Sequence, residues 1–285
     1  MAVAPNDAML NAKLQEEATR MSALNHPHIV RYFGYVATPP MHCLVLEYCA
    51  RGTLTDVLKK SDPTKNPEKP LTWAEHKLPI LMGIARGMAY LHSFKPPIIH
   101  RDLKPDNVLI ESSYRAKIAD FGVSREELNN ETMTHAGTPL FMAPEQLRRG
   151  DYNHAVDVWA YACVLECLIT HTQVYTKWLK RTREDGGLTS QQLMNAIGAN
   201  RMRPQAPDAH FLEELIWDCA AFEWDDRITF KDVIWALELY HGQAAAEDEA
   251  AAAGLLEQEG ADEDADGGGG GASSSEEGGG ENEED

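Results

Sequence analysis

The chain has 285 residues, enough for one large domain or two lobes, and a net charge of −19. Fifteen acidic residues and no Lys or Arg lie from Glu247 to Asp285, so residues 1–246 carry a net charge of only −4. That balance argues against nucleic-acid binding, which a basic stripe would indicate. The five cysteines form no CxxC pair, and no apolar run is long enough to cross a membrane. We therefore expect a soluble, cytoplasmic or otherwise intracellular protein without a zinc site or disulfide framework.

The first part of the chain predicts a helix followed by two short strands. Apolar side chains recur at helical spacing over residues 10–24. Residues 29–36 and 43–46 have the composition of strands, with a Pro-Pro turn between them. A short helix is expected to follow over residues 52–60.

A longer helix is expected to begin near Thr72 and to end near His92. Thr72 and Glu75 match a capping box, in which the Thr hydroxyl and the Glu carboxylate satisfy free amide groups of the first turn. Asp102 then lies in a loop between this helix and a strand at 108–110. Such a loop can expose a reactive side chain while holding it rigidly.

The second half of the chain is predicted to be mostly helical. Residues 155–170 are apolar on most sides, which is typical of a buried helix. Further helices are expected over 211–221 and 230–240. Residues 243–285 are rich in Ala, Gly, Glu and Asp, and they bury too little apolar area to offset their chain entropy. We therefore expect an acidic, disordered C-terminal tail.

Three short motifs indicate the chemistry of the chain. HRDLKPDN occupies residues 100–107, DFG residues 120–122 and APE residues 143–145. Their order and spacing resemble the catalytic loop, the magnesium-binding loop and the activation-segment end of eukaryotic protein kinases. Lys104, in its Leu-Lys-Pro context, resembles the serine/threonine type. The Met-Ala-Pro-Glu context at residues 142–145 makes the chain resemble most closely the tyrosine-kinase-like branch of these kinases. The resemblance implies an α+β, protein-kinase-like fold, with a small N-lobe of one helix and two or three strands on a mainly helical C-lobe.

The resemblance also implies phosphoryl transfer from ATP, which asks the protein mainly for positioning and charge stabilisation. Asp102 is expected to accept the proton of the attacking hydroxyl, and Lys104 to lie beside the transferred group. Asn107 and Asp120 are expected to hold Mg²⁺.

A hinge at residues 47–52 is expected to bind the adenine of ATP. By resemblance, Leu46 is the gatekeeper beside Glu47, and Cys49 offers its main-chain amide. Leu109 is expected to lie under the adenine ring.

Other residues match structural and regulatory positions of the family. Asp157 resembles the buried carboxylate that anchors the catalytic loop, and Glu145 and Arg227 match an ion pair between the activation segment and the helical lobe. Phe121 belongs to the DFG motif and is given a structural role.

Arg101 implies control by an activating kinase, because an Arg beside the catalytic Asp can pair with a phosphate. Thr132 and Thr134 are the best acceptors for that phosphate. The alternative is that both are ordinary polar loop residues.

The start of the chain departs from the family pattern. It contains neither a G-x-G-x-x-G loop nor a strand with the Val-Ala-x-Lys lysine, although Glu17 matches the glutamate that pairs with this lysine. Lys13 is read as a surface partner of Glu17 and not as a replacement. Three explanations stand: a serine/threonine kinase sequence with a wrong start, a pseudokinase that binds proteins, or a minimal kinase completed by a partner chain.

The sequence thus predicts a kinase domain over 1–242, comprising an N-lobe remnant at 1–47, the hinge and a C-lobe at 53–242, followed by the tail at 243–285. The expected activity is phosphorylation of protein substrates on Ser or Thr with ATP and Mg²⁺, with impaired ATP binding in this chain. The alternative is a non-catalytic, protein-binding pseudokinase or fragment. No nucleic-acid or membrane partner is expected, and the oligomeric state is not predicted.

Overall fold

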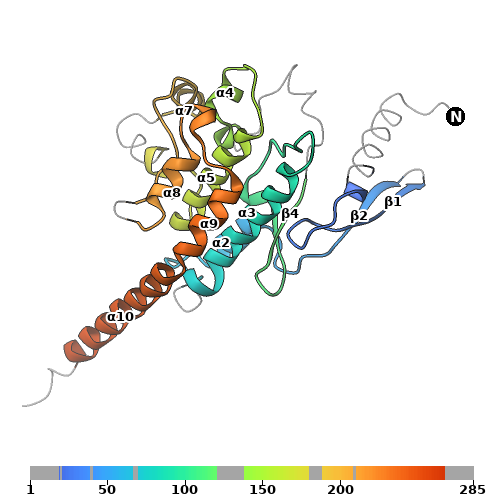
Figure 1. The fold of residues 1–285 in the computed structure, drawn as a ribbon. Coiled ribbons are helices and arrows are strands. Elements are labelled where there is room, and N and C mark those ends of the chain that lie inside the picture. The colour runs from blue at the N-terminus through green and yellow to red at the C-terminus, as the bar shows by residue number, and fades with distance from the viewer. Residues whose placement is uncertain are drawn as a thin grey trace, which may run out of the picture.

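The computed structural model of the chain describes residues 19, 21–38, 41–66, 70–120, 138–179, 188–207 and 210–266. Two small antiparallel sheets and a larger set of helices make up these residues. Figure 1 shows the sheet β1–β2 at one end of the molecule and helix α10 projecting from the other. The predicted α+β organisation, with a small strand-containing part and a mainly helical part, is confirmed.

Strands β1 (Tyr32–Thr38) and β2 (Met41–Leu46) form an antiparallel hairpin, close to the predicted positions. The hairpin leaves large apolar side chains in solvent, among them Phe33 and Val45, which are 60% and 43% exposed. A two-stranded sheet is marginal on its own. The helix predicted over residues 10–24 lies for the most part outside the described residues.

The second sheet pairs β3 (Val108–Ile110) with β4 (Ala116–Ile118). It also ties the hairpin end of the molecule to the helical part, because Val30 N–H donates to the Ile118 carbonyl and Ile118 N–H donates to the His28 carbonyl, both at 2.9 Å. Gly87 permits this close approach. A Cβ at Gly87 would lie 2.8 Å from the His28 carbonyl oxygen.

The larger part is built mainly from helices. The helices are α2 (Leu54–Lys60), the π-helical turn η1 (Trp73–Lys77), α3 (Leu78–His92), α4 (Pro144–Leu147), α5 (Ala155–Thr170), α7 (Ser190–Gly198), α8 (Glu213–Cys219) and α9 (Phe230–Leu239). In the described ranges they are accompanied by the 3-10 turns η2 (Pro105–Asn107), η4 (Thr138–Phe141) and η5 (Trp224–Asp226). The helices predicted near 52–60, 155–170, 211–221 and 230–240 are all present.

Helix α5 forms the centre of the core, because every residue from Ala155 to Leu168 is buried. A helix that is apolar all round needs neighbours on all sides, and α8 and η4 are among those that supply them. Helix α3 packs against α9 and against β4. The core therefore holds the ends of α3, α5 and β3, and the 100–107 loop lies between α3 and β3.

Helix α10 (His241–Asp266) differs from the disorder expected from residue 243 onward. Its first half is rich in Ala, the strongest helix former, and Ala244 is fully buried. Asp248 fixes the helix to η1, because its carboxylate accepts the N–H groups of Trp73 and Ala74 at 2.6 and 2.8 Å. Helix propensity and one charged anchor thus replace the missing apolar stripe. Despite the length of α10, no helix in the described ranges has both the length and the apolar character to span a membrane.

The capping box predicted at Thr72 and Glu75 is wrong. Thr72 makes no side-chain cap, and its hydroxyl lies 2.9 Å from His76 Nδ1 instead. The first turn is π-helical, with Lys77 N–H donating to the Thr72 carbonyl at 3.0 Å. This wider turn displaces the amide that an α-helical box would satisfy, and Asp248 caps the helix from a distant part of the chain.

Candidate active site

The 100–107 loop is anchored through its backbone to one buried carboxylate on α5. Asp157 is fully buried, and its oxygens accept the N–H groups of His100 and Arg101 at 2.9 and 2.8 Å. His92, the last residue of α3, places Nε2 2.9 Å from the same carboxylate. Three hydrogen bonds stabilise the charge of Asp157 in the core and hold the start of the loop against α5.

His100 fixes the next part of the loop from inside the core. Its Nε2 lies 2.9 Å from the Ala119 carbonyl, so this nitrogen carries the proton, and its Nδ1 accepts Asp102 N–H at 3.3 Å. The buried imidazole thus connects the 100–107 loop to the residue that precedes Asp120. Arg101 and Asp120 both have left-handed backbone angles, with φ of 69° and 56°. Strained backbone of this kind is concentrated at functional sites.

Asp102, Lys104 and Asn107 form one polar cluster at the exposed side of the loop. Lys104 Nζ lies 2.8 Å from Asp102 Oδ2. Asn107 donates its amide to the Asp102 carbonyl at 2.8 Å and to Oδ2 at 3.1 Å. The Asp102 side chain remains 28% exposed. The structure therefore brings together three of the four residues predicted to be catalytic, with the carboxylate of Asp102 held in place and accessible.

The residues expected to hold Mg²⁺ have the donors that this ion prefers. Because the Asn107 amide nitrogen is turned toward Asp102, its amide oxygen points elsewhere and can act as a ligand. Asp120 is exposed, and Ala119 N–H donates to the Asn107 carbonyl at 2.9 Å, which keeps the two positions close. Mg²⁺ is typically held by one or two carboxylates together with substrate phosphates. The donor set fits this ion.

The residues expected to form the hinge lie beside β3 and β4. Arg51 N–H donates to the Ile110 carbonyl at 3.0 Å and Ile110 N–H donates to Gly52 at 2.9 Å, so the segment after Cys49 runs next to Leu109. The Cys49 side chain is buried, which raises its thiol pKa. Its main-chain N–H has no hydrogen-bond partner within the described part of the chain. An unpaired amide next to a half-buried Leu109 fits the edge of an adenine ring.

Leu46 and Glu47 lie at the start of this segment. Leu46 ends β2 and is 37% exposed. The Glu47 carboxylate pairs with Lys117 at 2.8 Å, and this ion pair lowers the pKa of Glu47 against the opposing effect of burial, which is the largest single influence. Lys117, on β4, also lies 3.3 Å from Glu111.

Glu145 and Arg227 form a buried, bidentate ion pair. The two nitrogen–oxygen distances are 2.6 and 2.9 Å, and the Arg227 side chain is fully buried. Arg227 also donates to three backbone carbonyls, those of Ala155, Ala221 and Phe222. All the charge-bearing groups of the pair are satisfied, so it connects α4 to α5 and to the segment before α9.

Two side chains of this region, His92 and Lys117, were not predicted from the sequence, and four residues that were predicted lie outside the described part of the chain. His92 could have been found from its position at the end of the helix before the loop, and Lys117 from a lone charge in an apolar strand. The other four expected residues, Glu17, Phe121, Thr132 and Thr134, lie outside the part of the chain that the structure describes.

The chain matches the protein kinase domain family over residues 2–236. Serine/threonine-protein kinase CTR1 of Arabidopsis thaliana is 36% identical over 200 residues, which cover 70% of this chain and 22% of the relative. Serine/threonine/tyrosine-protein kinase HT1 of the same plant is 32% identical over 236 residues, 82% of this chain and 56% of the relative. The Dictyostelium discoideum protein named "Probable serine/threonine-protein kinase drkC" is 35% identical over 233 residues, 79% of this chain and 29% of the relative.

The chain spans between 22% and 56% of the length of these three relatives. The match covers both sheets, the helices from α2 to α8 and most of α9. It therefore includes the anchored loop, the cluster around Asp102 and the Glu145–Arg227 pair. Because the family match extends over most of its length, the chain belongs to the protein kinase domain family.

Proposed function

We propose that the chain transfers the γ-phosphoryl group of ATP to Ser or Thr hydroxyls of protein substrates. The observation that carries this proposal is the cluster in which Asp102, Lys104 and Asn107 share one carboxylate, held against the core by Asp157. Phosphoryl transfer depends on positioning and on charge stabilisation. This cluster supplies positioning and charge stabilisation through side chains that are held in place by their mutual contacts.

Asp102 accepts the proton of the attacking hydroxyl in this proposal. Lys104 lies 2.8 Å from Asp102 and places a positive charge next to the transferred group. Asn107 and Asp120 hold Mg²⁺, which neutralises the phosphate charges when it is bound. The hinge binds adenine through the Cys49 N–H, with Leu109 against the ring.

Arg101 gives this site a means of control. It is exposed, and its guanidinium carbon lies 5.9 Å from the centroid of the Tyr152 ring. We propose that phosphorylation of Thr132 or Thr134 by an activating kinase provides a phosphate that pairs with Arg101.

The test compares two aspartates of the same loop in the purified full chain. Asp102→Asn removes the base, whereas Asp106→Asn removes an exposed charge from the neighbouring turn η2. We expect Asp102→Asn to lower phosphate transfer from ATP to a mixture of Ser/Thr peptides by about 100-fold or more. Asp106→Asn should change the rate less than about threefold. Equal rates for Asp102→Asn and the wild type would refute the role of Asp102.

A second candidate function is non-catalytic protein binding, with impaired ATP binding in this chain. It is favoured by the exposed apolar side chains of β1–β2. Thermal unfolding with and without millimolar MgATP separates the two functions, since a ligand that binds only the folded state raises stability by RT ln(1 + [L]/Kd). An unchanged melting temperature at millimolar MgATP would favour the non-catalytic function.

A further inference from the structure

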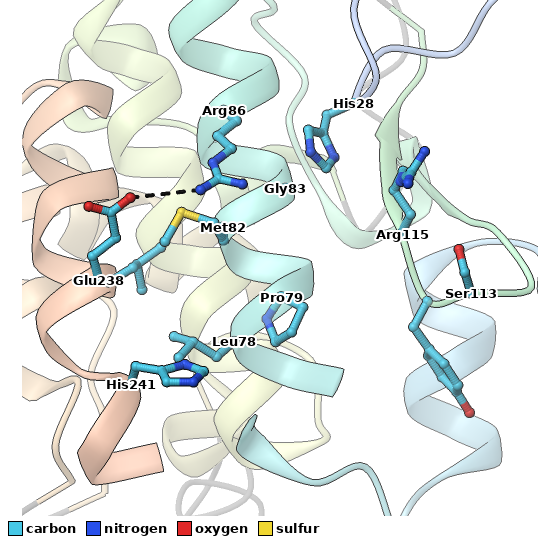
Figure 2. Close-up of a pocket in the computed structure, with 12 residues that line it drawn as sticks. His28, Leu78, Pro79, Met82, Gly83, Arg86, Ser113, Arg115, Glu238 and His241 are labelled. Atoms are coloured by element: carbon cyan, nitrogen blue, oxygen red, sulfur yellow. Dashed lines mark ion pairs between the residues drawn. The ribbon is translucent and has the colours of Figure 1, made fainter. Parts of the chain in front are cut away.

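A groove separate from the catalytic loop runs along one side of α3. Its lining comes from the first half of α3, the β3–β4 turn, the junction of α9 and α10, and His28, and its volume is about 690 Å³. Figure 2 shows α3 between Glu238 and His241 on one side and His28, Ser113 and Arg115 on the other. None of the residues proposed for phosphoryl transfer lines this groove.

The floor of the groove is apolar. It is formed by Leu78, Pro79 and Met82 of α3 and by Leu237 of α9, and the two leucines are buried. Gly83 lies in the same row and has a steric reason to be glycine. A Cβ at Gly83 would lie 2.8 Å from His28 Nδ1, so the missing side chain lets the imidazole rest against the helix.

The rim of the groove is cationic. Its positive charges are those of Arg86 and Arg115, against a single carboxylate, Glu238, and the imidazoles of His28 and His241 also line it. The pKa of His28 is lowered first by burial and then by the nearby charges of Arg115 and Arg86, against a hydrogen bond to the Ala116 carbonyl that raises it. The groove is thus electropositive as well as apolar.

The two arginines of the rim are only weakly paired. Arg86 lies 3.7 Å from Glu238, with side chains that are 50% and 57% exposed. Arg115 lies 3.9 Å from Glu111 and is 52% exposed. Exposed ion pairs at such distances contribute little. Both guanidinium groups can therefore turn to an incoming carboxylate, which they can bind through two parallel hydrogen bonds.

We propose that this groove binds an acidic peptide segment of a protein partner. Apolar side chains of the segment lie on the floor, and its carboxylates pair with Arg86 and Arg115. A small molecule fits less well, because small-molecule sites enclose most of their ligand whereas the rim side chains here are half exposed. The charge of the groove selects an acidic partner, and the apolar floor selects one with aliphatic or aromatic side chains next to the acids.

The acidic end of this chain is the competing occupant. Helix α10 begins at the edge of the groove with His241 and continues to Asp266. At a rise of ~1.5 Å per residue, Glu257 lies about 24 Å along the helix from His241. Figure 1 shows α10 directed away from the helical body. Beyond Asp248, which is held at Trp73 and Ala74, the helix therefore runs away from the groove, and this favours a segment from another protein.

Selection from a random peptide display library on the immobilised full chain tests the proposal without any assay of phosphoryl transfer. The variant R86E/R115E reverses the charge of the two rim arginines. The matched control R201E/K231E makes the same change of net charge at two exposed residues that do not line the groove. Urea midpoints of both variants, which alter only exposed side chains, confirm that they are folded.

We expect the wild type and the control to enrich peptides that combine Asp or Glu with apolar residues. A synthetic peptide from that set should bind R86E/R115E at least about tenfold more weakly than the wild type, and R201E/K231E within about twofold. Enrichment of basic or uncharged peptides, equal affinity for R86E/R115E, or no enrichment at all would each overturn the proposal. Arginine-dependent binding of a synthetic peptide of residues 254–285 to the full chain would also overturn it, because the occupant would then be the tail.

Discussion

Replacing Asp248 with Ala tests whether α10 is an integral part of the fold. The Asp248 carboxylate accepts the N–H groups of Trp73 and Ala74, the first two amides of the helical segment that continues through α3. No side chain of that segment's own first turn caps it. The substitution leaves both amides without their acceptor and removes a negative charge from the positive end of a helix.

The expected cost follows from three contributions. Loss of a capping side chain costs about 0.5–2 kcal/mol, and loss of its charge at the helix N-terminus costs about 0.3–1 kcal/mol. The third contribution is the loss of a favourable charge near the buried Lys77. Burial lowers the pKa of Lys77 to about 8, and the charges of Asp248 and Glu247 oppose that effect. We expect a total of about 2 kcal/mol, which corresponds to a fall in melting temperature of about 4–8 °C for a domain of this size.

Urea unfolding followed by circular dichroism measures this loss, with Glu249→Ala as the matched control. Glu249 is exposed on the next position of α10, so its replacement removes the same charge without removing a cap. Asp248→Asn keeps one acceptor oxygen and should lie between the wild type and Asp248→Ala. Equal midpoints for Asp248→Ala and Glu249→Ala would refute the capping role and the account of why α10 is helical.

Three further predictions concern polar groups that are buried or partly buried. Glu145→Gln should destabilise the fold by about 3–5 kcal/mol in urea unfolding, because it leaves the buried Arg227 guanidinium without its counter-charge. His92→Phe removes one of three hydrogen bonds to Asp157 and should cost about 1–2 kcal/mol by the same measurement. Burial lowers the pKa of His210 to about 4. As the pH falls, His210 therefore becomes protonated in the unfolded chain at a higher pH than in the folded chain. The free energy of unfolding should therefore decrease between about pH 6.5 and pH 4. His210→Asn should flatten the dependence of the urea midpoint on pH over that range.

Each of these predictions has an outcome that contradicts it. For the Glu145–Arg227 pair, the control is Glu238→Gln, because the exposed partner of Glu238, Arg86, lies 3.7 Å away. If Glu145→Gln and Glu238→Gln lower the free energy of unfolding by equally small amounts, burial of the pair is not important. An unchanged midpoint for His92→Phe would show that Asp157 is satisfied without it. If His210→Asn follows the same pH curve as the wild type, the titrating group is another one.

The sequence predicted well what depends on local pattern. Helix α5 has the predicted bounds because a run that is apolar on all sides has no stable arrangement except a buried helix. Strand β3 was predicted over its full length, 108–110, since it follows directly on the loop motif. The residues predicted to act together in the 100–107 loop lie close in space because only eight consecutive residues separate its ends.

What the sequence did not predict depends on contacts between distant residues. Asp248 caps a helix that begins 175 residues earlier, and no local rule links an acid in an Ala-rich stretch to that helix. Lys117 was also missed. Its lone charge in an apolar strand marks the position, but strand propensity gives no reason for its burial. Its burial becomes favourable only when β4 places it between Glu47 and Glu111.

Helix α3 connects the Asp248 cap with the Asp157 anchor of the 100–107 loop. Asp248 caps the segment that leads into α3, and His92 at the end of α3 contacts Asp157. This continuity does not make the tail a switch for the 100–107 loop. The inner face of α3 is buried from Ile80 to Leu91, and the Tyr161 hydroxyl donates to the Leu81 carbonyl at 3.1 Å, close to the start of the helix. Fraying of the first turn therefore stops before it reaches His92. Loss of Asp248 should lower the stability of the fold while the anchor of the loop stays intact.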